Sequence, residues 1–147
     1  MALAPNATWT HFNLGYAHLY RGNMQAALKE MQLEPYEGGR LIGLAVVQHA
    51  LGNAKESDAA LAALEAKYEK PSSYNIASIY AFRGDADKAF AWLEKAIGYH
   101  DTGLSELPTW PDFTSLRKDP RWLPLLRRLG NSPEQLASVQ FRIDLPK

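Results

Sequence analysis

Histidines and paired carboxylates are the side chains here that could bind a metal or support catalysis. His11 and His18 stand seven residues apart and would share one face of a helix, but a metal needs further ligands nearby. Asp85 and Asp87 resemble a carboxylate pair, yet acidic residues are also favoured in the first turn of a helix by the helix dipole. The sequence therefore predicts no catalytic residue, no metal site and no cofactor.

Two further motifs could contact phosphates. Gly38-Gly39 lacks the lysine and the preceding strand of a phosphate-binding loop, so residues 37–40 are interpreted as a hinge between helices. A basic cluster near the C-terminus includes Asp112 and Asp119 among its neighbours and has no aromatic-glycine RNA-binding motif. It is interpreted as a solvated face, and we expect no nucleic-acid partner. The cluster consists of Arg117, Lys118, Arg121, Arg127 and Arg128.

The composition limits the class of protein. A chain of 147 residues with 46% hydrophobic and 11% aromatic residues can bury the core of one domain or one short repeat array. Sixteen basic side chains balance sixteen acidic ones, so no net field attracts nucleic acid or a membrane surface. The sequence has no cysteine, no apolar run of about 20 residues and no secretion-signal pattern. We expect a cytoplasmic protein without membrane contact.

A short pattern occurs three times along the chain. In each copy a small residue stands seven positions before a glycine and another stands five positions after it. The glycines are at positions 22, 52 and 84, so the intervals are 30 and 32 residues. A period in this range is typical of stacked supersecondary units. The copies contain Gly15, Gly22 and Ala27; Ala45, Gly52 and Ser57; and Ala77, Gly84 and Ala89.

Apolar residues recur at helical spacing almost throughout, which predicts an all-α protein. Each odd-numbered helix should end at a glycine, which accepts left-handed geometry, followed by Asn or Asp as the cap of the next helix. Such tight turns join antiparallel helices, and the small residues let the paired helices cross closely. The expected helices cover residues 7–21, 24–33, 40–51, 54–69, 71–83 and 86–99, in hairpins at 8–37, 38–69 and 70–99.

This pattern resembles the tetratricopeptide repeat (TPR), and the resemblance covers roughly residues 8–99. The second copy is the weakest match, with Gln48 in place of tyrosine and Ser57 in place of alanine. The resemblance implies a right-handed superhelix of three hairpins that binds proteins and does no chemistry. The third copy, residues 74–99, fits best through Ile76, Ala77, Tyr80, Gly84, Ala89, Leu93 and Ala96.

The segments outside the repeats are interpreted separately. Residues 2–6 resemble the end of a repeat, so residues 1–7 are expected to be the tail of a preceding repeat, in a fragment of a longer chain, or an N-terminal arm. Residues 100–130 are rich in proline and tryptophan and should form a capping segment with two short helices. The second carries a stripe of Leu123, Leu126 and Leu129 that would cover the end of the array. Residues 131–147 form a C-terminal tail.

The capping segment also resembles the stretch that follows the repeats in large bacterial regulators of the cyclase and winged-helix kinds. The similarity implies the C-terminal module of a multidomain regulator. It rests on Leu116-Arg117, Asp119-Pro120-Arg121-Trp122 and Leu125-Leu126.

In the tetratricopeptide family the first helix of each hairpin lines the concave surface. The resemblance places an aromatic surface with a few amides there, which suits an extended peptide, and we expect about half of these residues to pack in the core. No cation occupies the positions of the family's carboxylate clamp, here Phe12, Tyr16, Gly43, Pro71 and Asn75, so an apolar or internal peptide is expected. The predicted concave-face residues are Trp9, Phe12, Asn13, Tyr16, Tyr20, Ile42, Val46, His49, Tyr74, Asn75, Ser78 and Phe82.

Two functions follow as hypotheses. The first is a non-catalytic protein–protein interaction module that binds a peptide segment on its concave face, within a larger regulator. The alternative is a structural or self-association module, including a homodimer, whose groove is filled by its own C-terminal tail.

Overall fold

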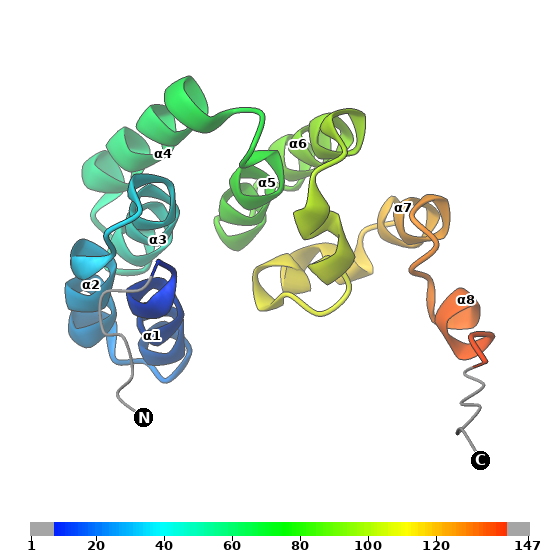
Figure 1. Cartoon of the computed structure of the whole chain (residues 1–147), viewed down its shortest axis with the longest axis horizontal. Helices are drawn as coiled ribbons and strands as arrows, with labels where there is room; N and C mark the ends of the chain where they lie inside the picture. Colours follow the sequence, from blue (N-terminus) through cyan, green and yellow to red (C-terminus); the bar gives the residue numbers. More distant parts are fainter. Residues whose placement is uncertain (1–7, 141–147) are drawn as a thin grey trace, which may run out of the picture.

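The computed structural model describes residues 8–140, and this range contains helices and turns but no strand. The all-α fold predicted from the sequence is therefore confirmed. Helices α1 to α6 follow an arc, and two 3₁₀ helices, η1 and η2, turn back toward its inner side (Figure 1). The elements are α1 (Thr10–Tyr20), α2 (Met24–Leu33), α3 (Glu37–Ala50), α4 (Ala54–Tyr68), α5 (Ser73–Phe82), α6 (Ala86–Tyr99), η1 (Thr102–Glu106), η2 (Pro111–Lys118), α7 (Trp122–Arg128) and α8 (Pro133–Ala137).

The three repeated glycines end α1, α3 and α5 in the way their spacing predicts. Gly22, Gly52 and Gly84 each have a φ of 80°, in the left-handed region that favours glycine. The amide of the next residue then bonds the carbonyl five positions back, at 2.9 Å in all three turns. The capping prediction holds only for the Asp85 side chain, which accepts from the Lys88 amide. The side chains of Asn23 and Asn53 make no cap hydrogen bond.

The hinge predicted at residues 37–40 is wrong, because these residues form the first turn of α3. The glycines of α3 give neighbouring side chains room rather than flexibility. A Cβ on Gly38 would lie 2.7 Å from the ring of Tyr36, and a Cβ on Gly43 would lie 2.0 Å from the Met31 sulfur. Glycine therefore lets α3 approach α2 closely.

The buried side chains form two clusters along the arc. One lies among α1 to α4 with one side of α5, and it includes Leu19, Met31, Leu64 and Ile76. The other joins α5 and α6 to residues 104–126, and Leu107 and Phe113 of that segment are fully buried in it. No helix within residues 8–140 is long and apolar enough to span a membrane.

Helix α7 lies against α6. The Arg121 guanidinium lies 4.3 Å from the centre of the Phe90 ring, and Arg128 pairs with Glu94 at 2.6 Å. The predicted stripe of Leu123, Leu126 and Leu129 is only partly right. The buried residues of α7 are Trp122, Leu125 and Leu126, because the helix begins at Trp122 and turns this side toward the second cluster.

We predict that Gly43→Ala lowers the free energy of unfolding by about 1–2 kcal/mol, because overpacking against the buried Met31 outweighs the gain in helix propensity. Gly98→Ala in α6 is the matched control, since a Cβ there meets nothing within 4 Å. It should raise stability by about 0.5–1 kcal/mol. Urea unfolding of both variants measures the difference, and equal effects would contradict the close approach of α3 to α2.

Candidate functional site

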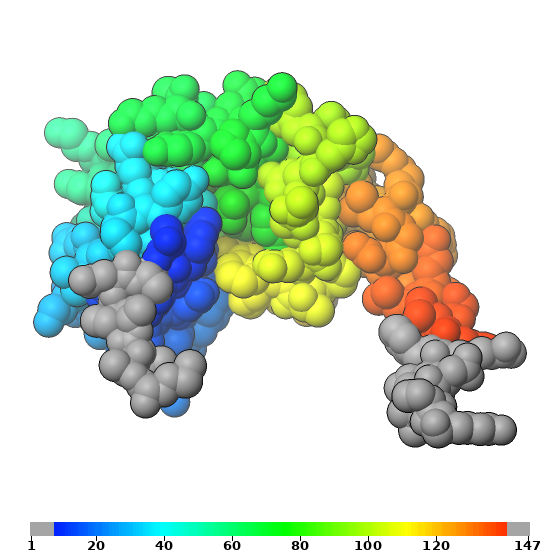
Figure 2. All heavy atoms as spheres, in the orientation of Figure 1, coloured from blue at the N-terminus to red at the C-terminus, as the bar shows by residue number. Residues whose placement is uncertain are grey.

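The inner side of the arc is largely occupied by residues 102–118, the inner segment. Figure 2 shows these residues, in yellow-green and yellow, against the blue surface of α1 and the green surface of α5. The Phe113 ring lies 5.3 Å from the Tyr74 ring, and Ser115 Oγ donates to the Ala81 carbonyl at 2.8 Å. This segment therefore covers much of the surface on which the sequence predicts a peptide groove.

One buried carboxylate links this segment to the first helix. Asp112 of η2 is 3% exposed and accepts hydrogen bonds from Tyr16 Oη at 3.1 Å, from Tyr20 Oη, and from Trp110 Nε1 at 3.1 Å. The Trp110 ring also packs 5.4 Å from the Tyr16 ring. These four residues, the Asp112 cluster, join positions up to 96 residues apart in the chain.

Burial has the largest effect on the pKa values of the ionisable groups in this cluster. Burial raises the pKa of Asp112, and the hydrogen bonds from Tyr20, Trp110 and Tyr16 oppose that shift. Burial, followed by the negative charge of Asp112, raises the pKa values of Tyr16 and Tyr20. Both phenols therefore remain protonated and serve as donors at neutral pH.

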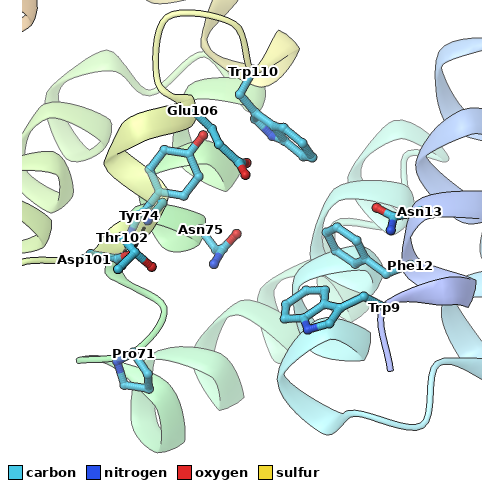
Figure 3. Close-up of a pocket in the computed structure, with 11 residues that line it drawn as sticks. Trp9, Phe12, Asn13, Pro71, Tyr74, Asn75, Asp101, Thr102, Glu106 and Trp110 are labelled. Carbon is cyan, nitrogen blue, oxygen red and sulfur yellow. Dashed lines mark hydrogen bonds between the residues drawn. The ribbon is translucent and has the colours of Figure 1, made fainter. Parts of the chain in front are cut away.

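A cleft of about 390 Å³ remains between the start of α1 on one side and α5 with η1 on the other (Figure 3). Aromatic side chains line both walls, together with Asn13 and Asn75. Two carboxylates, of Asp101 and Glu106, complete it. The full lining is Trp9, Phe12, Asn13, Pro71, Tyr74, Asn75, Asp101, Thr102, Gly103, Glu106 and Trp110.

Trp9 is held at the edge of this cleft by a second buried carboxylate. Glu34 is 1% exposed and accepts from the amides of Trp9 and Phe12, both at 3.0 Å, and from the Tyr36 amide at 3.1 Å. It therefore caps α1 from outside the helix. Trp9 itself has a φ of 71°, which a residue with a side chain adopts only when its surroundings hold it there.

The structure divides the predicted concave-face residues into three groups. Trp9, Phe12, Asn13, Tyr74 and Asn75 line the cleft together. Tyr16, Tyr20 and Ser78 lie nearer the inner segment, and Tyr16 and Ser78 are buried. Ile42 and Val46 are core residues, while His49 and Phe82 face each other with ring centres 6.0 Å apart and do not line the cleft.

Sequence reasoning missed the wall formed by Asp101, Thr102, Gly103, Glu106 and Trp110. These residues follow the last repeat, so the periodic pattern gives them no register. The shift in composition after residue 99 marks a separate element but not the surface it contacts. The Asp101 carboxylate caps η1 by accepting from the Gly103 amide at 3.0 Å. A capping residue of this kind predicts the start of a turn but not which surface the turn contacts.

The histidines do not converge. His11 Nδ1 lies 2.7 Å from a Glu30 carboxylate oxygen, and the part of the chain that the structure describes contains no group of three His, Asp or Glu side chains arranged to hold a metal ion. Asp85 caps α6, and Asp87 is paired with Arg121 at 2.9 Å. Asp85 and Asp87 are thus engaged in local interactions.

Residues 71–99 match the family model of the tetratricopeptide repeat. The match covers α5 and α6, which form the copy that fits the repeat pattern best in the sequence. No curated protein and no solved structure gives a significant match to the chain. Since repeats of this kind typically mediate contacts between proteins, the match supports a protein–protein interaction module.

We predict that Asp112→Ala lowers the free energy of unfolding by about 2–4 kcal/mol, because it leaves buried donors on Tyr16 and Trp110 without an acceptor. Asp58→Ala is the control, since that carboxylate is largely exposed in its ion pair with Arg83 and such pairs contribute little. Urea unfolding followed by circular dichroism compares them. A loss no larger than that of Asp58→Ala would show that the cluster does not hold the inner segment.

The raised pKa of Asp112 also predicts a pH dependence. The folded chain binds this proton more tightly than the unfolded chain, so the group's contribution to stability grows as the pH falls. The gain begins as the pH falls through the raised pKa and is complete below the ordinary value of 3.8. The difference in unfolding free energy between the wild type and Asp112→Asn should therefore shift in favour of the wild type from pH 7 toward that value. A flat difference, or one of opposite sign, would contradict the assignment.

Proposed function

We propose that this chain is a non-catalytic protein–protein interaction module that binds a short peptide segment in the cleft between α1 and α5. The observation that carries the proposal is that the cleft leaves aromatic surface accessible on an inner face that residues 102–118 largely cover. Trp9 is 38% exposed there, although its backbone is held in place by the buried Glu34. Rigid aromatic side chains with accessible area are typical anchors of protein interfaces.

The polar groups of the cleft fit a peptide backbone. Asn13 and Asn75 lie on opposite walls, and each side-chain amide offers both a donor and an acceptor (Figure 3). A peptide between them could bond one amide on each side while its apolar side chains contact Trp9 and Phe12.

The size of the cleft favours a short ligand. At about 390 Å³ it lies toward the lower end of the range of small-molecule pockets, roughly 300–1,000 Å³, and has room for one or two side chains. The extended peptide expected from the family resemblance would need the surface that residues 102–118 occupy. We therefore propose a turn or a chain end of the partner as the ligand.

The larger protein, the cellular location and the partner of this module stay predictions from the sequence. The resemblance of residues 116–126 to the segment after the repeats of large bacterial regulators supports a place in such a regulator, in the cytoplasm, with a protein as partner. The balanced charge supports the expectation of no nucleic-acid partner.

A second candidate is a structural or self-association module with a self-filled groove, and the Asp112 cluster favours it. The segment proposed as the filler is then 102–118. Residues 131–140 do not enter the groove, because α8 lies beside α7, where Gln135 Nε2 donates to the Arg127 carbonyl at 3.2 Å. Residues 141–147 of the predicted tail lie outside the described residues.

A peptide-display selection on the purified chain tests the proposal. We expect one motif to be enriched, and its affinity to fall at least tenfold in Trp9→Ala and in Asn75→Ala, because both side chains line the cleft. Tyr99→Ala is the control, since this exposed aromatic contacts Glu69 and Lys70 instead. Circular dichroism confirms that each variant is folded.

Two results would contradict the proposal. No enrichment would indicate that the cleft takes no peptide, and sedimentation that shows a concentration-dependent dimer would then favour the second candidate. An enriched motif whose binding survives both cleft substitutions would place the binding surface elsewhere.

A further inference from the structure

The charged groups of the cleft all have the same sign. Asp101 and Glu106 are acidic, and the lining contains no lysine, arginine or histidine. The two carboxylates differ in what they already bind. Asp101 is committed to the fold, because it accepts from the amides of Tyr74 at 2.9 Å and Gly103 at 3.0 Å. The Glu106 carboxylate is solvent-exposed and makes no hydrogen bond or ion pair with any residue between 8 and 140.

A second group beside Glu106 also lacks a partner. The Tyr74 side chain is 97% buried, with 3% of its surface exposed, yet its hydroxyl forms no hydrogen bond with the residues that the structure describes. A buried hydroxyl without a partner is unfavourable, so such a group commonly marks a place that a ligand or water completes. Figure 3 shows this hydroxyl toward the end of the cleft where Glu106 and Trp110 lie. Burial and then the negative charge of Glu106 raise the pKa of Tyr74.

The aromatic residues that line the cleft would also favour a cation. The faces of aromatic rings attract cations, tryptophan most strongly. Trp9, Phe12 and Trp110 line the cleft that holds Glu106, and Trp9 and Phe12 are in edge contact with ring centres 5.0 Å apart. A free carboxylate, a hydroxyl oxygen that can accept, and aromatic faces together form the surroundings that a cationic side chain prefers.

We infer that the cleft is selective for a peptide segment with a basic side chain, arginine or lysine, whose cation pairs with Glu106 and donates to the Tyr74 hydroxyl. This inference rests on the proposed function, since it names the class of peptide that the same cleft takes. The aliphatic part of such a side chain would lie along Trp9 and Phe12. An acidic segment would meet Glu106 as a like charge and be excluded.

The experiment uses a random heptapeptide display library on the purified full chain. We expect enrichment of arginine or lysine at one position of the selected motif. In the synthetic peptide, citrulline in place of arginine keeps the shape and removes the charge, and it should weaken binding about tenfold. In Glu106→Gln the difference between the two peptides should fall to less than about twofold, whereas the control Asp87→Asn, whose carboxylate lies at the α6–α7 junction, should keep it.

The salt dependence gives an independent reading. Raising the salt from about 0.05 M to about 0.5 M should weaken the arginine peptide and leave the citrulline peptide nearly unchanged, because salt screens the ion pair alone. A neutral or acidic motif that Asn75→Ala abolishes would overturn this inference and leave the proposed function intact. Equal affinities for both peptides would do the same. If no peptide is enriched, the proposed function itself fails.

Discussion

The rest of this architecture depends on the hydrogen bonds that the buried Asp112 carboxylate accepts. Units of a repeat array ordinarily contact only their neighbours, so an array is open by construction. Here one buried acid gathers donors from Tyr16 and Tyr20 on the first helix and from Trp110 beside η2, up to 96 residues away. Each donor offsets part of the penalty for burying the charge, and removing one raises that penalty for the whole group. The cluster therefore acts as a unit that holds the inner segment against α1.

The contact between the inner segment and α1 also explains the form of the cleft. The buried Glu34 fixes the start of α1 against the α2–α3 turn, and Asp112 fixes the same helix further along against η2. With α1 held at two places, Trp9 and Phe12 face the opposite wall in a defined position. A binding surface that is already ordered loses less conformational entropy when a ligand binds. The strained backbone of Trp9 fits this role, since it is maintained by the contacts around it.

The parts of the structure that follow from local chemistry could be predicted from the sequence. Gly22, Gly52 and Gly84 mark the hairpin turns because their left-handed geometry is a property of the residue itself. The roles of Gly38 and Gly43 do not follow from residue type, because they depend on where the side chains of Tyr36 and Met31 pack. The repeat register predicts that Phe12 and Asn75 share the inner face, and both line the cleft. No local pattern links Tyr16 to Asp112 or reveals the wall at 101–110. That information lies in contacts between segments that are far apart in the chain.

The two acidic sites of the inner face have different tasks, and the difference follows from burial. Asp112 is enclosed, so its donors come from the protein and its charge serves the fold. Glu106 is exposed beside the cleft, so its charge remains available to a ligand. The two are coupled, because Glu106 belongs to η1 and its position relative to α1 is maintained through Trp110 and the Asp112 cluster. A ligand that contacts both Trp9 and Glu106 needs these residues in the positions that the Asp112 cluster maintains. By linkage it stabilises the cluster by the same free energy with which the cluster favours its binding.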